Sequence, residues 1–183
     1  VRSTNPVVGG DEVACEADEG GDYVIADILP RRNYVIRRAS NLSKESHIIA
    51  ANVDQALLMA SLRSPETPTE FVDRFLVTCE AYKVPVMILL SKLDLQDAEA
   101  VAEFRAVYEG AGYRVLEVSV REGRGVEEVR ELLAGRTTLV SGNSGVGKST
   151  LIQAIDPSLD IRTGEISESH HKGRHTTTFS TMY

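Results

Sequence analysis

A glycine-rich octapeptide has the residue types and spacing that bind phosphate groups. Residues 142–149 read GNSGVGKS and match G-x-x-x-x-G-K-[ST] at every fixed position. Such glycines let backbone N–H groups point inward at a phosphate chain, while Lys148 can reach the β and γ phosphates and Ser149 can bind Mg²⁺. The alternative is a glycine-rich turn that matches by accident. The expected nucleotide contacts are Gly142, Asn143, Ser144, Gly145, Val146, Gly147, Lys148, Ser149 and Thr150.

The residues on both sides of this octapeptide favour the phosphate-binding interpretation. Residues 137–140 are suited to a strand, and the run from Lys148 to Ile152 is suited to the start of a helix. A helix N-terminus adds the positive end of its dipole beside the phosphates. We therefore predict a phosphate-binding loop between a strand and a helix, with Lys148 also serving catalysis.

A second segment predicts which base is bound. The apolar residues 84–90 are typical of a strand buried on both faces, and Ser91, Lys92, Leu93 and Asp94 follow it. The carboxylate of Asp94 can accept from N1–H and the 2-amino group of guanine, while the stem of Lys92 packs along the base. Adenine lacks these donors and would leave the carboxylate unpaired, at a cost of about a few kcal/mol. Taken alone, the tetrapeptide also fits a solvated turn at a strand end.

A third segment supports the choice of guanine. Residues 113–120 are predicted to form the next strand, which ends at Ser119 and Val120. A backbone N–H of this pair can donate to O6 of guanine. Both base-reading segments precede the phosphate loop, whereas in ordinary small GTPases they follow it. The order indicates a circularly permuted G domain.

In this order of motifs the chain resembles the circularly permuted GTPases of small ribosomal subunit biogenesis, the RsgA or YjeQ family. Further matching segments are residues 4–6, 10–13, 48–55 and 173–178. The resemblance implies GTP hydrolysis to GDP and phosphate with Mg²⁺, and a role in late maturation of the small (30S) ribosomal subunit with binding to rRNA. The expected partners are the small subunit and its rRNA, with no membrane, and the protein is expected to be a monomer.

Two departures from the family pattern stand out. Ser91 occupies the position where the base-reading motif usually has Asn, which leaves open how this loop is tied to the phosphate loop. No D-x-x-G sequence follows Thr178, so we expect a G domain that is incomplete at its C-terminal end. The family's zinc domain is expected to be absent too, because Cys15 and Cys79 are isolated.

The polar stretch between residues 156 and 178 is expected to act as a switch loop that nucleotide orders. By analogy with GTPases, the hydroxyl of Thr177, or otherwise Thr176, completes the Mg²⁺ shell. A neutral imidazole at His175 could orient the attacking water. A guanine-nucleotide-binding module without turnover is the alternative function, and Asp94 argues against an ATP-using enzyme.

The N-terminal part of the sequence differs from the rest. Residues 11–15, 23–29 and 33–37 are predicted short strands, and the resemblance implies that residues 1–47 form part of an OB-fold barrel whose first strands are missing. Four arginines near its end could bind RNA or could form a solvated strand edge. They are Arg31, Arg32, Arg37 and Arg38.

From residue 48 onward, strands and helices alternate, which predicts an α/β P-loop domain over residues 48–183. Residues 56–61 are a predicted buried strand. Helices are predicted over residues 97–110 and 125–134, and Thr67 to Glu70 has the capping-box pattern of a helix start.

Length and composition restrict the classes of protein to which the chain can belong. The chain has 183 residues, 42% of them hydrophobic, which is enough for a substantial core. Its formal charge of −7 argues against general affinity for nucleic acid. No apolar run approaches the roughly 18–20 residues of a membrane helix, and two unpaired cysteines suit a reducing compartment, so the cytoplasm is expected.

Overall fold

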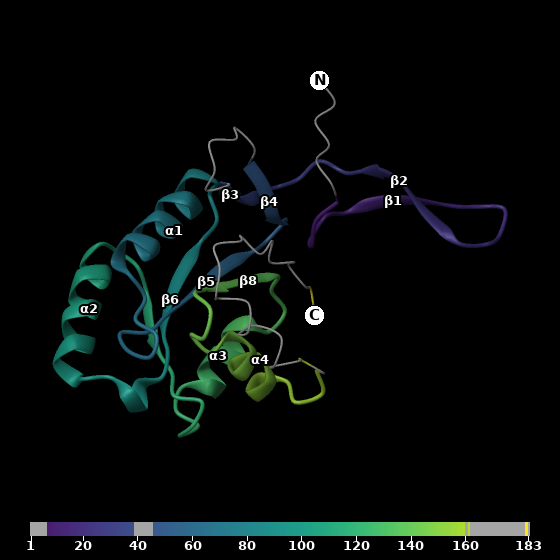
Figure 1. Ribbon diagram of the computed structural model, residues 1–183. Coiled ribbons are helices and arrows are strands. Elements are labelled where there is room, and N and C mark those ends of the chain that lie inside the picture. Colours follow the sequence, from purple (N-terminus) through teal and green to yellow (C-terminus); the bar gives the residue numbers. More distant parts are fainter. Residues whose placement is uncertain (1–6, 39–45, 160, 162–181, 183) are drawn as a thin grey trace, which may run out of the picture.

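A four-stranded parallel sheet with helices on both faces forms the body of the molecule (Figure 1). The structure is a computed structural model and describes residues 7–38, 46–159, 161 and 182. The strand order is β7-β6-β5-β8, with bounds β5 (Gln55–Ala60), β6 (Val86–Leu90), β7 (Val115–Glu117) and β8 (Thr138–Gly142). The helices are α1 (Thr69–Ala81), α2 (Ala98–Gly110), α3 (Val126–Leu133) and α4 (Lys148–Ile155), with a short 3₁₀ helix, η1 (Leu93–Leu95), after β6.

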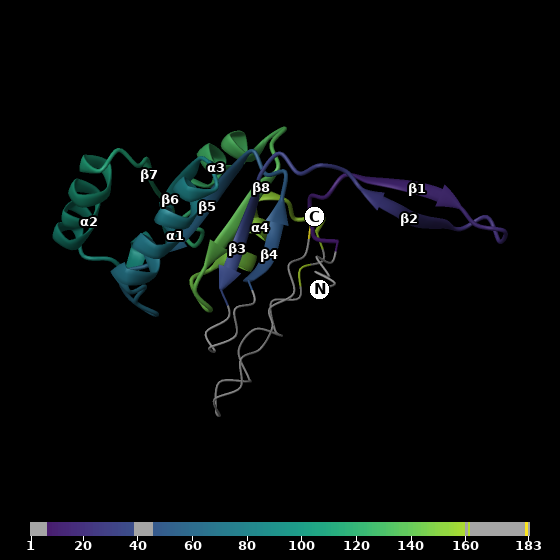
Figure 2. The ribbon, with the colours of Figure 1, turned by 90° about the horizontal axis from the view of Figure 1, so that it is seen from above.

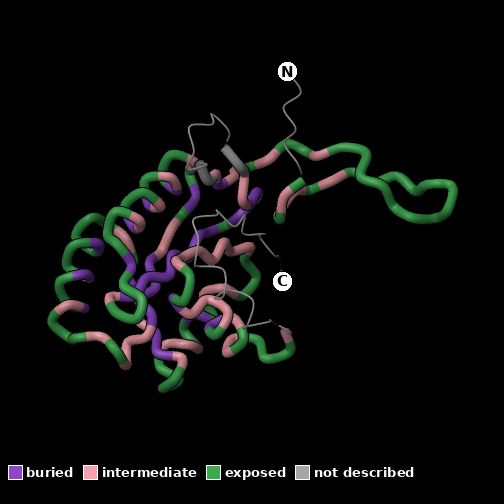
Figure 3. Tube along the Cα trace, in the orientation of Figure 1, coloured by how far each residue is buried: buried purple, intermediate pink, exposed green. Residues whose placement is uncertain are grey.

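Alternating side chains of the central strand β5 build two separate cores. Leu58 and Ala60 pack in the core that contains α1 and α2, while Leu57 and Met59 pack in the core that contains α3 and α4. Every residue of β5 is buried, as expected for a parallel strand covered on both faces (Figure 3). The predicted α/β architecture of this part of the chain is confirmed.

The parallel strands send all the motif-bearing loops to one edge of the sheet. Residues 91–94 follow β6, residues 118–121 follow β7, and the glycine-rich loop follows β8. The carboxyl ends of parallel strands share an edge, which is where open α/β sheets bind ligands. Segments far apart in the sequence therefore meet at this edge.

Two antiparallel hairpins precede the sheet. One pairs β1 (Val13–Ala17) with β2 (Tyr23–Ile28), and the other pairs β3 (Tyr34–Arg38) with β4 (Ser46–Ala51). The first hairpin projects away from the body, and its strands are almost wholly exposed (Figures 2 and 3). Within the described residues the hairpins form two separate sheets, so the OB-fold barrel remains a prediction.

The β3–β4 hairpin packs directly on the α/β body. Val35 and Ala50 share a hydrophobic cluster with Cys79 of α1. The rings of Tyr34 and Tyr82 add a tilted aromatic contact with centroids 4.9 Å apart. This hairpin spans the predicted domain boundary between residues 47 and 48, and its packing connects the N-terminal segment to the α/β body.

Most of the expected elements are present with shifted ends, but two details of the prediction are wrong. Thr67 does not cap α1, because its hydroxyl accepts from the N–H of Ser61 and Pro68 occupies the N-cap. The strand expected to reach residue 120 ends at Glu117, and the next residues turn into a loop. None of the helices in the described part of the chain combines the length and apolar character that a membrane crossing requires.

Candidate nucleotide-binding site

The glycine-rich loop joins β8 to α4, as its pattern predicts. Gly142 lies so close to β5 that an added Cβ would be 2.5 Å from the carbonyl oxygen of Met59. Gly147 is the N-cap of α4 and has a φ of 106°, which side-chain-bearing residues rarely adopt. The buried Val146 anchors the loop in the core beneath it. The loop is therefore fixed from below while its polar groups remain on the surface side.

Lys148 points back into its own loop. Its Nζ donates to the carbonyl oxygens of Gly142, at 2.8 Å, and Asn143, at 2.9 Å. Burial lowers the pKa of this ammonium group, because the partly enclosed site disfavours the charged form. A phosphate chain in the loop would supply the opposing charge that the two neutral carbonyls do not.

Ser149 and Thr150 follow Lys148 in the first turn of α4. At this position the hydroxyl of Ser149 fits a protein ligand to Mg²⁺, alongside phosphate oxygens and water. Within residues 7–38 and 46–159, no group of three or more His, Cys, Asp or Glu side chains could hold a metal ion.

The base-reading segment forms a sharp turn stabilised by neighbouring loops. Lys92 has a left-handed backbone with φ of 54°, and its Nζ donates to the carbonyl oxygen of Ser64. Asp94 lies in η1, and its Oδ1 accepts from Oγ of Ser119 at 2.8 Å. Only 13% of the Asp94 side chain is exposed. The structure thus brings together the two segments that were predicted to read the base.

Ser91 supplies the tie that the sequence left open. Its hydroxyl is 3.1 Å from the carbonyl oxygen of Ala60 and 2.8 Å from that of Val146, inside the phosphate loop. A hydroxyl carries one proton, so the shorter contact to Val146 is the principal bond. The base-reading loop is joined to the phosphate loop although serine replaces the asparagine of the motif.

The segment after β7 needs a correction at Ser119. Its backbone N–H donates to the carbonyl oxygen of Arg124 at 3.0 Å, so it cannot also donate to a base. Among the hydrogen bonds of the described residues, none involves the N–H of Val120. Val120 is therefore the member of the predicted pair whose N–H suits O6 of guanine.

Two residues outside the motifs also contact the base-reading loop. Nε2 of Gln96 lies within hydrogen-bonding distance of the carbonyl oxygens of Ser91 and Lys92 and of the hydroxyl of Ser61. No sequence pattern singles out either residue: Gln96 lies just beyond the motif, and Ser61 meets it from 35 positions away.

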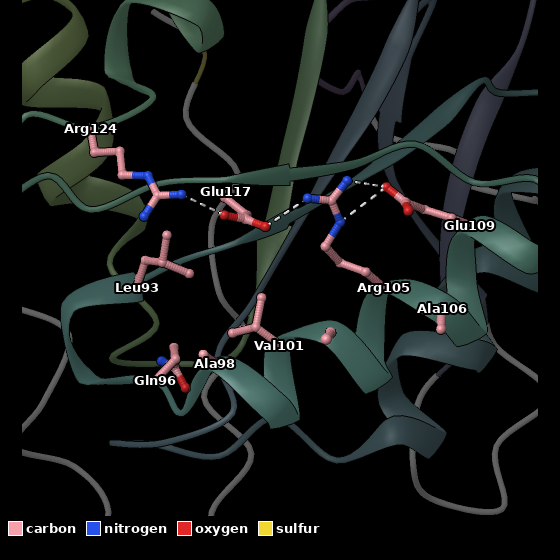
Figure 4. Close-up of a pocket in the computed structure, with 10 residues that line it drawn as sticks. Leu93, Gln96, Ala98, Val101, Arg105, Ala106, Glu109, Glu117 and Arg124 are labelled. Atoms are coloured by element: carbon pink, nitrogen blue, oxygen red, sulfur yellow. Dashed lines mark hydrogen bonds and ion pairs between the residues drawn. The ribbon is translucent and has the colours of Figure 1, made fainter.

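A cavity of about 600 Å³ lies beside the base-reading loop and not over the phosphate loop. Leu93 lines it at one end, and α2 provides most of one wall (Figure 4). Glu117 accepts there from Arg105 at 2.8 Å and from Arg124 at 3.0 Å. The charged side chains of the cavity therefore have partners within the protein, and the predicted nucleotide contacts, apart from Leu93, lie outside it.

Two of the four arginines proposed for RNA have partners within the chain. Arg31 forms a two-pronged ion pair with Asp11, through contacts of 2.6 and 2.7 Å. Arg32 donates to Asp54 at 2.8 Å and to the carbonyl oxygen of Asn52. The side chains of Arg37 and Arg38 lie outside the described part of the structure. RNA binding by these arginines stays a prediction.

The predicted catalytic and metal-binding residues of the switch loop, His175 and Thr177, lie outside the described residues, as does Thr176. Their roles therefore also remain predictions.

Comparisons with known proteins agree with this geometry. The chain is 50% identical over 186 residues to the small ribosomal subunit biogenesis GTPase RsgA of Bacteroides fragilis, an alignment that covers 100% of this chain and 60% of the relative. The RsgA of Porphyromonas gingivalis is 50% identical over 187 residues, covering 100% of this chain and 59% of the relative. The chain thus spans about 60% of the length of the curated relatives it matches.

Two solved structures share the fold. The crystal structure of YjeQ from Thermotoga maritima matches with a TM-score of 0.67 and 34% identity, over 88% of this chain and 55% of that one. YloQ, a circularly permuted GTPase, matches with a TM-score of 0.60 and 27% identity, over 84% and 51% of the two chains. A family model described as RsgA GTPase matches residues 28–183. On this evidence the chain belongs to the RsgA GTPase family.

Proposed function

We propose that the protein containing this chain binds GTP and hydrolyses it to GDP and phosphate during maturation of the small ribosomal subunit. The observation that carries the proposal is the convergence of Asp94, Ser119 and the phosphate loop at one edge of the sheet, with Ser91 bonded to Val146. The curated relatives, which bear the name small ribosomal subunit biogenesis GTPase, support the biological setting.

The division of labour within the site follows from the chemistry of its residues. The carboxylate of Asp94 reads N1–H and the 2-amino group of guanine, the N–H of Val120 reads O6, and the stem of Lys92 covers one face of the base. Lys148 opposes the charge of the β and γ phosphates, and the N-terminus of α4 contributes its dipole. Charge that develops on the phosphoryl oxygens is stabilised by the same groups.

Mg²⁺ bound by Ser149 and Thr177 would neutralise phosphate charge and orient the γ-phosphoryl group. His175 would orient the attacking water as a neutral imidazole. We also propose the division into an N-terminal OB-fold segment, residues 1–47, and a G domain from residue 48. The β3–β4 hairpin would be the joint between them.

The proposed partner is the small ribosomal subunit with its rRNA, and the proposed setting is the cytoplasm, where the protein acts as a monomer. The proposed RNA contacts are the four arginines, of which Arg31 and Arg32 also have carboxylate partners within the chain. Zn²⁺ would belong only to a further domain of the family's longer proteins.

The test is GTP turnover by the full-length protein with small subunits, with large subunits and with neither, across a series of salt concentrations. Small subunits are expected to accelerate hydrolysis, and added salt to weaken the association steeply because phosphate contacts release counterions. Stimulation by large subunits alone, or by neither particle, would refute the proposed partner. Charge reversal at Arg37 and Arg38 that leaves subunit binding unchanged would refute their RNA contact but spare the GTPase.

A further inference from the structure

The side-chain amide of Gln96 connects three points around the base-reading loop. Its Nε2 is 3.0 Å from Oγ of Ser61, 3.2 Å from the carbonyl oxygen of Ser91 and 3.1 Å from that of Lys92. Two of these acceptors belong to the base-reading loop, and the third belongs to the residue that follows β5. Gln96 therefore bridges that loop and the central strand of the sheet.

The orientation of this amide follows from its surroundings. Ser61 donates its own hydroxyl proton to the carbonyl oxygen of Arg63 at 2.6 Å, so it can only accept from Gln96. With the amide reversed, the oxygen of Gln96 would face three acceptors. The Nε2 donor must point into the loop.

The oxygen of the same amide makes no hydrogen bond among the described residues. This oxygen, Oε1 of Gln96, is buried. Burying such an acceptor without a partner costs about 1–3 kcal/mol. An apolar side chain of similar length would fill the same space without burying an unpaired acceptor. The presence of glutamine therefore points to a requirement for its Nε2 donor.

The loop has a conformation that needs such support. Lys92 is a non-glycine residue in the left-handed region, with φ of 54°, which costs of order 1–2 kcal/mol. The carbonyl oxygens on which Gln96 acts are those of this residue and the one before it. The same turn leads directly into η1, which carries Asp94.

From this arrangement we propose that Gln96 is a positioning residue for guanine recognition: it holds the Lys92 turn so that the carboxylate of Asp94 meets the 2-amino edge of the base. The proposal rests on the proposed function, since it concerns how the same site selects its nucleotide. Gln96 does not itself touch the base.

The experiment compares the affinities of GDP and IDP, which differ only in the 2-amino group that Asp94 would accept from. In Gln96→Met, which keeps the length of the side chain but removes the donor, the GDP-to-IDP affinity ratio is expected to fall by about tenfold, the value of one lost hydrogen-bonding alignment. Ser61→Ala removes the anchor on the β5 side and is expected to lower the ratio in the same direction.

Gln55→Met provides a matched control. Gln55 is buried at the start of β5, and its amide bonds Leu132, Thr138 and Arg136, far along the sheet from the loop edge. Its replacement is expected to lower the melting temperature and leave the GDP-to-IDP ratio at the wild-type value.

An unchanged ratio in Gln96→Met, or an equal fall in Gln55→Met, would overturn the proposal. If Gln96→Met does not fold, Ser61→Ala decides: a wild-type ratio in that variant overturns it. A wild-type chain that fails to prefer GDP over ADP would instead refute the proposed function, so the two failures are distinguishable.

Discussion

The hydroxyl of Ser91 lies 2.8 Å from the carbonyl oxygen of Val146 and joins two loops whose residues are 55 positions apart in sequence. Ser91 is 3% exposed and Val146 is fully buried, so the bond is shielded from water. The contact fixes the distance between the groups that read the base and the groups that bind the phosphates. A nucleotide that must touch both sets depends on that distance.

Replacing Ser91 by alanine should weaken GDP binding by about three- to tenfold, since the lost bond is worth roughly 0.5–1.5 kcal/mol and leaves the carbonyl of Val146 without its donor. Titration calorimetry measures the effect. Thr78→Ala is the control, because that hydroxyl bonds only the carbonyl of Arg74 within α1. Equal GDP affinity in Ser91→Ala and wild type would show that the tie does not serve binding.

Replacing Asp94 by asparagine should weaken GDP binding by roughly 2 kcal/mol or more, because an amide cannot accept from both guanine donors. Xanthosine diphosphate should bind the variant better than it binds the wild type, since its 2-oxo group accepts from the new amide. Asp97→Asn is the nearby control, a carboxylate that caps α2 through the N–H groups of Glu99 and Ala100. If the variant keeps wild-type GDP affinity, Asp94 does not read the base.

Lys148→Met should reduce nucleotide affinity by at least about 100-fold, because it removes the charge that opposes the phosphates. The nucleotide-free variant should nevertheless melt at the same temperature as the wild type or higher. The reason is the lowered pKa of Lys148: an environment that lowers the pKa of an ammonium group disfavours its charge in the folded state. Nucleotide affinity and melting temperature are measured for Lys148→Met and for the control Lys83→Met, which replaces an exposed lysine. A strongly lowered melting temperature in Lys148→Met would contradict the expected effect on stability.

The ion pair between Asp11 and Arg31 predicts a loss of stability in acid. The hydrogen bond from Arg31 holds the pKa of Asp11 below its usual value, and the carboxylate side chain is fully buried. A folded-state pKa below the unfolded one means that this stability is complete above about pH 4 and is lost as the pH falls through the folded pKa. Urea unfolding between pH 6 and 3 should therefore show a smaller pH dependence in Asp11→Asn than in the wild type. Identical profiles would refute the coupling.

The phosphate loop could be predicted from the sequence because its geometry is local. Gly142, Gly147 and Lys148 act through backbone conformation and a short reach, so their spacing carries the information. The two-sided burial of β5 was likewise predictable, because an unbroken apolar run has few other solutions.

The bond from Ser91 to Val146 and the bridge from Gln96 to Ser61 could not be predicted, since they join residues 55 and 35 positions apart that only the fold brings close. Thr67 is another case in which the pattern is misleading. Its spacing to Glu70 is that of a capping box, but its hydroxyl accepts from the N–H of Ser61 and does not cap the helix. The capping-box pattern covers only residues 67–70 and does not take account of a donor six positions before Thr67.

The arginines show what charge patterning leaves undecided. A run of basic residues predicts a surface for anions, yet Arg31 is 13% exposed and bound to an aspartate 20 positions away. Whether a charge faces solvent or a partner is decided by the path of the chain. The sequence alone therefore left both interpretations open.

Calorimetric titration of this 183-residue chain with GDP and with ADP in the presence of Mg²⁺ directly tests whether the site selects guanine. The convergence of Asp94, Ser119 and the phosphate loop predicts that GDP binds at least about 100-fold more tightly than ADP, because adenine offers the Asp94 carboxylate neither an N1–H nor a 2-amino donor. Equal affinities, or a preference for ADP, would contradict the assignment of this edge of the sheet as a guanine-nucleotide site.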